Sequence, residues 1–354
     1  MRLLLLPFLL PFLLLLPTFL GSCYITDQGF AYLGLLGKAR ALDRVLADPG
    51  TAEATRALVR RAQAIEAFGI ESLGLKETRN FHTLVELESD TLVHVVQACA
   101  ELSFDRHLWD YPFVGKMPYR GFFDSKGAEA EAARLRGRGL DVIVRNADAF
   151  STLGWLADPL WSFMSSYEES DLADLVLHEL THATAFRSGS DDWNEGIATF
   201  VGREGARQWL VAQYGEGSAQ VTGLRASHAD TAAFAGFLRE TADELEALYS
   251  SPIPDEEKRQ AKQRILAERA AAFSAGYEGN FSTDRYKAVR MEAINNAWLD
   301  LYRLYEGDPA LYRSWFERID KGNLGDFIAD MSGLAKAKGE PTTAMRKRLS
   351  ATLP

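Results

Sequence analysis

The stretch D-L-A-D-L-V-L-H-E-L-T-H (residues 171–182) contains an H-E-x-x-H pattern, with His178 and His182 four residues apart. Apolar residues recur around them at helical spacing, so a helix is predicted here, with its N-cap at Ser170 and Asp171. On this helix the two imidazoles share one face, with their Cβ atoms ~6 Å apart, and can bind one metal ion. Glu179 points about 100° further round the helix, beside the metal, where a general base belongs.

The third ligand is expected from the next stretch, W-N-E-G-I-A-T-F (residues 193–200). Catalytic zinc sites use three protein ligands and leave a fourth position for water or substrate. A turn rich in Gly, Ser and Asp separates the two stretches, and Glu195 falls in the first turn of a second helix, from which it could face the histidines. Asp191 and Asp192 are rival carboxylates, although loops more often use such residues for capping. A third histidine in the metzincin position is excluded, because that residue is Ser188.

A structural pair of histidines without a metal is the alternative interpretation. The chain has six histidines in 354 residues, and a chance H-E-x-x-H is expected in roughly one such chain per hundred or fewer. A carboxylate at a suitable distance makes coincidence rarer still. The sequence therefore favours the metal site.

This arrangement resembles that of the gluzincins, the thermolysin-like metallopeptidases whose third zinc ligand is a Glu on a following helix. The segment W-N-E-G-I-A-T-F is especially similar to one in the membrane-alanyl type aminopeptidases. The resemblance implies a thermolysin-like core in which His178, His182 and Glu195 bind one Zn²⁺ and Glu179 is the catalytic base.

Two features depart from the gluzincin pattern. The spacer between His182 and Glu195 is shorter than in those large enzymes. Thr199 stands where thermolysin has an Asp that orients a ligand histidine. Such outer partners fix the tautomer and orientation of metal-binding imidazoles, so another group is needed here. Asp174, four residues before His178 and on the same face, is the candidate.

A closer resemblance covers most of the chain beyond its first residues. Four segments occur in order around the zinc motif: P-Y-R-G-F-F-D (118–124), G-L-D-V-I-V (139–144), A-F-S-T-L-G-W-L-A-D-P-L (149–160) and N-N-A-W-L (295–299). They are similar to segments of the bacterial family of predicted zinc aminopeptidases that are regarded as lipoproteins. This resemblance implies aminopeptidase activity on peptides.

Two further parts of the active site are predicted. Peptidases of this kind hold the substrate backbone as an added strand on a sheet edge, and the edge is expected at Ser151, Thr152, Leu153 and Gly154; a plain hairpin packed on the zinc helix is the alternative. A Tyr donor is the usual means of stabilising the oxyanion, and Tyr302 and Tyr305 on a helix predicted over residues 283–305 are the catalytic candidates, although two ordinary core aromatics would show the same spacing.

The first residues, M-R-L-L-L-L-P-F-L-L-P-F-L-L-L-L-P-T-F-L-G-S-C, read as a secretory signal that ends in a lipobox-like L-G-S-C. On this interpretation Cys23 is lipidated and the body is periplasmic and attached to a membrane. A transmembrane anchor and a simple cleaved signal are the alternatives, and all three place the body outside the cytoplasm.

Composition restricts the class of partner. The formal net charge is −10, which argues against nucleic acid as a ligand. It also argues against electrostatic docking on anionic lipid, so membrane attachment is expected through the N-terminus alone. The aromatic content of 11% argues against disorder.

The expected fold class is α+β and mainly α, with a small mixed sheet packed on the zinc helices. Four regions are expected: a signal peptide (1–22), an N-terminal helical segment (23–80), the α/β metallopeptidase core (81–215) and a C-terminal helical lobe (216–354). Strands are predicted near residues 91–98, 118–123, 141–144 and 149–153. Helices are predicted over residues 29–47, 51–69, 128–138, 222–250, 255–275, 283–305, 309–320 and 323–338, besides the two zinc helices.

The predicted function is zinc-dependent peptide hydrolysis outside the cytoplasm, with removal of N-terminal residues as the expected activity. An endopeptidase is one alternative. A lipid-anchored binding or assembly protein that keeps the fold without turnover is another, against which the intact Glu179 speaks.

Overall fold

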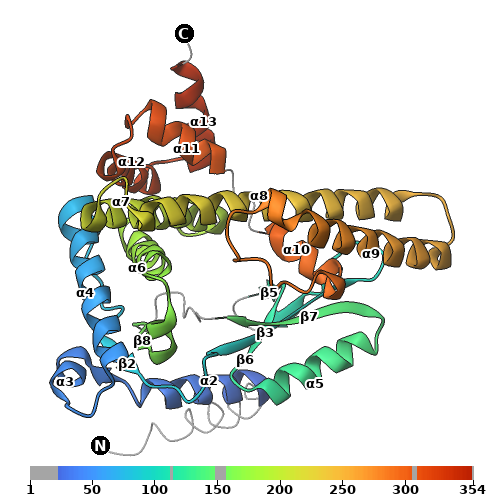
Figure 1. The fold of residues 1–354 in the computed structure, drawn as a ribbon, viewed down its shortest axis with the longest axis horizontal. Coiled ribbons are helices and arrows are strands. Elements are labelled where there is room, and N and C mark those ends of the chain that lie inside the picture. Colours follow the sequence, from blue (N-terminus) through green and yellow to red (C-terminus); the bar gives the residue numbers. More distant parts are fainter. Residues whose placement is uncertain (1–22, 112–114, 148–156, 305–308, 353–354) are drawn as a thin grey trace, which may run out of the picture.

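The structure is a computed structural model in which residues 23–111, 115–147, 157–304 and 309–352 are described (Figure 1). These residues are mainly helical, with small sheets near the middle of the molecule. Within them, no helix combines the length and the apolar character that crossing a membrane requires.

The N-terminal region consists of helices, but the helix predicted over residues 29–47 is wrong as a single element. It is divided into α2 (Cys23–Leu36) and α3 (Leu42–Ala47), with the short strand β1 (Arg40–Ala41) between them. The interruption follows Gly37, whose position after the last helical residue suits a residue without a side chain. Helix α4 (Glu53–Leu73) then ends at Gly74 in the left-handed conformation.

The central sheet has the order β6-β3-β7 and is antiparallel throughout. β3 (Val93–Ala100) pairs along its whole length with β7 (Leu140–Ala147), and its other edge pairs with β6 (Arg120–Phe122). α5 (Ser125–Arg136) covers one face, where its alanines pack against Val96 and Val142. The opposite face meets α10, which explains why β3 is buried on both sides.

Two smaller sheets complete the β structure. β2 (Thr83–Val85) lies between β1 and β8 (Leu160–Trp161), and β4 (Trp109–Tyr111) pairs with β5 (Gly115–Met117). These strands are not predicted from the sequence, because they have two or three residues each and are too short to show an alternating pattern of apolar and polar residues. The strand predicted over residues 149–153 lies outside the described residues.

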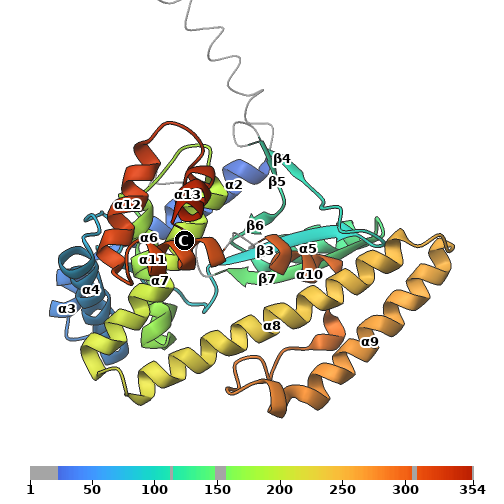
Figure 2. The ribbon, with the colours of Figure 1, turned by 90° about the horizontal axis from the view of Figure 1, so that it is seen from above.

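Helices make up most of the remainder (Figures 1 and 2). α6 (Glu169–Thr184) and α7 (Asp191–Tyr214) follow a 3-10 turn, η1 (Ser162–Ser166). α8 (Ala219–Ser250) and α9 (Asp255–Asn280) form a long hairpin, seen from above in Figure 2. α11 (Pro309–Arg318) and α12 (Leu324–Lys336) pack over α7, and α13 (Pro341–Ala351), which was not predicted, packs on α11 and α12.

The helix predicted over residues 283–305 is wrong in its first half. The chain there forms turns and the 3-10 helix η2 (Met291–Ala293), and α10 begins only at Asn296 and ends at Leu304. The carboxylate of Asp230 on α8 accepts hydrogen bonds from the backbone N–H groups of Ser282 and Thr283 at 2.8 and 2.7 Å. A residue about fifty positions earlier therefore holds this segment in a turn.

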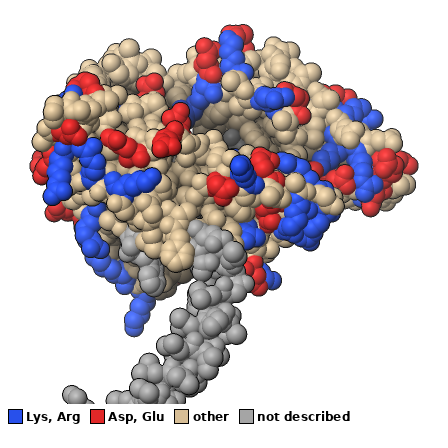
Figure 3. Space-filling model, turned by 90° about the horizontal axis from the view of Figure 1, so that it is seen from below, with Lys and Arg blue, Asp and Glu red and all other residues tan. Residues whose placement is uncertain are grey.

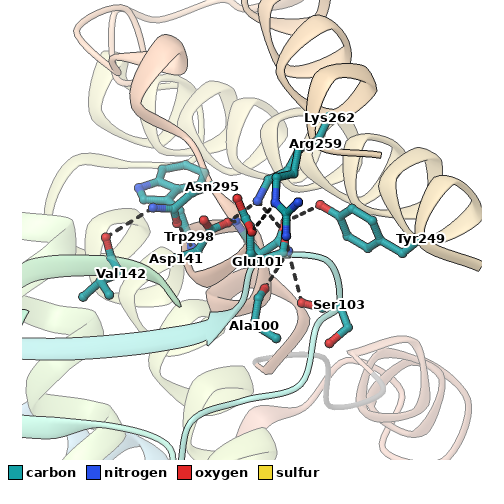
Figure 4. A network of polar contacts seen from close by, with 11 residues as sticks. Ala100, Glu101, Ser103, Asp141, Val142, Tyr249, Arg259, Lys262, Asn295 and Trp298 are labelled. Atoms are coloured by element: carbon teal, nitrogen blue, oxygen red, sulfur yellow. Dashed lines mark hydrogen bonds and ion pairs between the residues drawn. The ribbon is translucent and has the colours of Figure 1, made fainter. Parts of the chain in front are cut away.

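A buried polar network attaches α8, α9 and α10 to the central sheet (Figure 4). Asn296 is fully buried, and its amide donates to the backbone oxygens of residues 100, 101 and 103 at 3.0–3.1 Å. Lys262 of α9 donates to Asp141 of β7 at 2.5 Å, and Tyr249 of α8 donates to Asn296 at 2.7 Å. Because each buried polar group is paired, the network fixes how these helices sit on the sheet.

The largest core lies where α4, α6 and α7 meet, and it continues to α11 and α12. The expected N-terminal segment (23–80) thus shares one core with the zinc helices. Glycines allow the close approach. A Cβ on Gly205 of α7 or on Gly69 of α4 would lie 2.7 Å from a side-chain atom of Leu177 on α6.

Gly202 of α7 marks the tightest contact between α6 and α7. A Cβ there would lie 2.2 Å from Oδ1 and 2.8 Å from the backbone oxygen of Asp174, and 3.3 Å from Cβ of His178. The backbone oxygen belongs to α6 itself, so the clash can be relieved only by moving the helices apart. The absence of a side chain at Gly202 therefore sets the distance between α6 and α7.

Replacing this glycine should destabilise the protein. Gly202→Ala is expected to lower the free energy of unfolding by roughly 1–3 kcal/mol, because the added methyl group overpacks the helix contact. Gly236→Ala in α8 is the matched control: nothing lies within 4 Å of its Cβ position, so it should raise stability by about 0.5–1 kcal/mol. Urea unfolding of both variants checks this, and equal effects would contradict the account of the contact.

Candidate metal centre

The two helices of the H-E-x-x-H region form a hairpin joined by the loop of residues 185–190. α6 begins after Glu168, so the N-cap predicted at Ser170 and Asp171 is wrong by two to three residues. Asn194, buried in the first turn of α7, closes this loop: its side-chain amide donates to the backbone oxygen of Arg187 and accepts from the backbone N–H of Arg187, both at 2.8 Å. This pair of bonds closes the hairpin next to Glu195.

His178, His182 and Glu195 meet between the two helices. The Nε2 atoms of the histidines are 3.1 Å apart, and each lies 3.5 Å from a different carboxylate oxygen of Glu195. Among the described residues, this is the group of three His, Cys, Asp or Glu side chains whose ligand atoms converge, all within 4.8 Å. The histidines are about a fifth exposed and Glu195 is 60% exposed, so the centre opens to solvent on the carboxylate side.

These separations suit a single zinc ion. Two ligand atoms ~2.0–2.1 Å from zinc, at a tetrahedral angle, are ~3.3–3.4 Å from each other. The observed 3.1 and 3.5 Å lie on either side of that value. Two imidazoles and one carboxylate are also the donor set of a catalytic zinc site that keeps a fourth position open. The residues present therefore fit the ion.

The ionisable groups of the centre shift one another's pKa values. Burial lowers the pKa of His178, but its hydrogen bond with Glu195 and the nearby carboxylates outweigh burial and raise it. Burial and the neighbouring His178 lower the pKa of His182. The hydrogen bond with His178 holds the pKa of Glu195 below its usual range. The carboxylate is thus kept ionised, as a metal ligand must be.

Glu179 lies beside the three ligands, and Asp158 is its acidic neighbour. Burial raises the pKa of Glu179, the charge of His178 lowers it, and the charges of Asp158 and Glu195 raise it further. A carboxylate whose pKa moves up towards neutrality is suited to accept and return a proton. Among the described residues, no hydrogen bond occupies the carboxylate of Glu179.

Asp158 was not predicted as a site residue. It lies just before β8, and its Oδ1 accepts a hydrogen bond from the hydroxyl of Tyr32 on α2 at 3.2 Å. Burial raises its pKa, while the bond from Tyr32 lowers it. Its place in the sequence, in a D-P pair twenty residues before His178, gave only the signal of a turn. The tertiary fold brings it towards Glu179.

Asp174, the candidate to orient His178, contributes charge rather than a hydrogen bond. It packs against Gly202, and in the described part of the chain no hydrogen bond joins it to the imidazole. Burial raises its pKa to about 6, and the charges of Arg203 and His178 lower it. Its carboxylate in turn is one of the charges that raise the pKa of His178.

The other predicted residues are distributed as follows. The rivals Asp191 and Asp192 are exposed in the first turn of α7. Ser151, Thr152, Leu153, Gly154 and Tyr305 lie outside the described residues, as does the side chain of Tyr302, whose backbone belongs to α10. Cys23 is the first residue of α2.

Tyr312 of α11 explains the glycine of the N-E-G motif. A Cβ on Gly196 would lie 2.4 Å from the hydroxyl oxygen of Tyr312, which is buried. The ring of Tyr312 therefore occupies the position where any larger residue would place its side chain. The C-terminal helices thereby contact α7 directly after Glu195, a role that the sequence alone did not indicate.

Comparison with known proteins gives one match. The model of a family described as "Putative aminopeptidase" matches residues 23–345, and the chain belongs to that family. No curated protein and no solved structure matches. The matched region contains α6 and α7 and begins at Cys23.

Removing a ligand should remove the metal. Glu195→Gln is expected to lose most of its bound zinc, because the carboxylate, which is the one anionic donor beside two imidazoles, is replaced by a neutral amide. Asp192→Asn, which changes an exposed carboxylate three residues away on the same helix, should keep the zinc content expected of the unaltered protein, about one ion per chain. Elemental analysis of the purified proteins checks this, and equal zinc in both variants would contradict the assignment of Glu195.

Proposed function

We propose that this member of the aminopeptidase family is a zinc-dependent peptidase that removes N-terminal residues from peptides outside the cytoplasm. One observation carries the proposal: His178, His182 and Glu195 converge at separations that fit a single zinc ion, with Glu179 beside them. The family description supports peptidase activity.

The chemistry follows from the charges of these groups. Zinc held by the three ligands would polarise a peptide carbonyl and increase the acidity of water. Glu179 takes the proton from the attacking water and passes it to the leaving amine, for which its raised pKa is suited. Glu195 remains ionised and holds the histidines in place from the second helix.

The catalytic role of Glu179 can be separated from metal binding. Glu179→Gln should keep its zinc and lose roughly 10²–10⁴-fold in kcat, the usual contribution of a general base. Glu168→Gln, an exposed residue at the start of the same helix, is the control and should be unchanged in both respects. Hydrolysis of a panel of peptides with free N-termini checks this. Zinc-loaded protein that cleaves nothing in this panel would favour a binding protein over an enzyme.

Exopeptidase specificity requires a carboxylate for the substrate's α-ammonium group. The sequence offers Glu168, Glu169 and Glu204 as candidates for this contact. Glu169 accepts from Trp209 and Tyr214, and Glu204 pairs with Arg207, so both are already engaged. Glu168 is the N-cap of α6, about three helical turns from Glu179. Asp158 lies near Glu179, and the partner of its Oδ1 is the neutral hydroxyl of Tyr32. We therefore assign the α-ammonium contact to Asp158.

Neutralising Asp158 tests the exopeptidase assignment. Asp158→Asn keeps an oxygen that accepts the hydrogen bond from Tyr32 but loses the charge. The KM for peptides with a free N-terminus should rise about tenfold or more, consistent with loss of a charge-assisted hydrogen bond, while N-acetylated peptides should show no change. Faster cleavage of acetylated than of free peptides by the unaltered protein would establish an endopeptidase instead.

The proposed location rests on the sequence of residues 1–23, which reads as a lipoprotein signal ending at Cys23. The family match begins at that same residue. Lipidation of Cys23 would hold the zinc centre close to the membrane that carries the anchor.

A further inference from the structure

Helix α2 has two faces of opposite character. One face is fixed to the body: the hydroxyl of Tyr24 donates to the backbone oxygen of Gly121, Gln28 accepts from the N–H of Phe123 at 2.8 Å, and Tyr32 is buried. These three residues of α2 are four apart, so they share one side of the helix. The orientation of α2 on the body is therefore fixed.

The opposite face carries large apolar side chains without a cover. Phe30 is 73% exposed and Leu33 is 55% exposed, the highest and third-highest values among the exposed large apolar side chains of the described residues. At 100° per residue, both point roughly away from the face that holds Tyr24, Gln28 and Tyr32. An exposed aromatic and an exposed leucine, side by side on one fixed helix, indicate a contact surface.

The charges around this face suit a lipid surface. From Gln28 to Leu42 the sequence has no acidic residue, although Asp27 and Asp43 flank this stretch and the whole chain has a net charge of −10. Its charged residues are Lys38 and Arg40. Arg40 is paired with Asp48 at 2.7 Å, so Lys38 is the basic residue near the end of α2 that a headgroup can contact. The side of the molecule on which α2 lies is seen in Figure 3, where uncharged surface separates groups of acidic and basic side chains. Basic residues at the end of an apolar helix face favour contact with anionic headgroups.

The position of α2 in the chain identifies the occupant. The helix begins at Cys23, directly after an apolar segment of 22 residues. Lipid chains on Cys23 would attach the chain but would leave the body free to rotate about that point, and a second contact from an adjacent apolar helix face would restrict this rotation. Two side chains are too few to bind a bilayer alone, but an anchor at the first residue of the helix holds them at high local concentration near the lipid.

We propose that the face of α2 formed by Phe30 and Leu33 inserts into the membrane interface and, because its other face is locked to the body, fixes the orientation of the zinc centre relative to the bilayer. This inference rests on the anchor at Cys23 that is part of the proposed function, and it does not depend on zinc or on peptide hydrolysis. The net negative charge of the body then acts against any other face approaching anionic lipid.

The test uses the full chain, purified from membranes and reconstituted into vesicles of phosphatidylethanolamine and phosphatidylglycerol. Phe30→Cys and, separately, Leu33→Cys are labelled with a polarity-sensitive fluorophore; Cys99 is buried, and a lipidated Cys23 does not react. Phe186→Cys is the matched control, because Phe186 is 58% exposed and lies away from α2, directly after the zinc helix. Nitroxide-bearing lipids are then added to the vesicles as quenchers.

The labels at positions 30 and 33 are expected to shift to the blue and to lose most of their emission to the nitroxide lipids, whereas the label at 186 keeps its aqueous spectrum. Vesicle-bound protein whose labels at 30 and 33 stay aqueous would overturn the inference and leave the anchor intact. A blue shift without quenching would mean that protein covers the face, which also overturns it. Release of the unaltered chain into the soluble fraction would overturn the anchor and this inference together, with zinc binding and hydrolysis unaffected.

Discussion

The close approach of α6 and α7 is the constraint on which the metal centre depends. Gly202 faces Asp174 and Cβ of His178 with no room for a side chain, and Gly205 does the same against Leu177. The two helices can therefore lie near enough for Glu195 to reach both imidazoles across the gap. Around this contact the rest of the core is arranged: α4 approaches through Gly69, and α11 places Tyr312 against Gly196. The ligand geometry is thus a consequence of helix packing rather than of a specialised loop.

The electrostatics of the centre follow from partial burial. The histidines keep about a fifth of their surface, whereas Glu195 is largely exposed, so a ligand could reach the centre from the carboxylate side. The pKa values of the two nearby carboxylates shift in opposite directions: that of Glu195 is lowered by its hydrogen bond with His178, and that of Glu179 is raised mainly by burial. Two acidic groups whose pKa values move apart are suited to different roles, one as a permanent anion and the other as a proton carrier.

The sequence predicts a structural feature well when the residues that determine it are close together in the chain, and poorly when they are far apart. The i, i+4 spacing of His178 and His182 and the helix start before Glu195 are local, and the structure brings these three side chains together. The region before Asn296 was misread as helix because its turn is held by Asp230, from a distant helix. The place of Asp158 in the site has the same kind of cause: 126 positions separate it from Tyr32, so the family-like segment 149–160 that contains it does not indicate this contact.

The sequence separation of the contacts also bears on how the chain folds. The metal ligands lie in a helical hairpin closed by a short loop, so little chain entropy opposes their meeting. The hydrogen bonds from Asn295 and Asn296 to the region of the central sheet instead join residues separated by 153 to 196 positions. Contacts of low contact order form faster than those of high contact order. The hairpin can therefore assemble before α8, α9 and α10 have docked on the sheet, so the three candidate ligands can meet early in folding, while the rest of the chain is still unpacked.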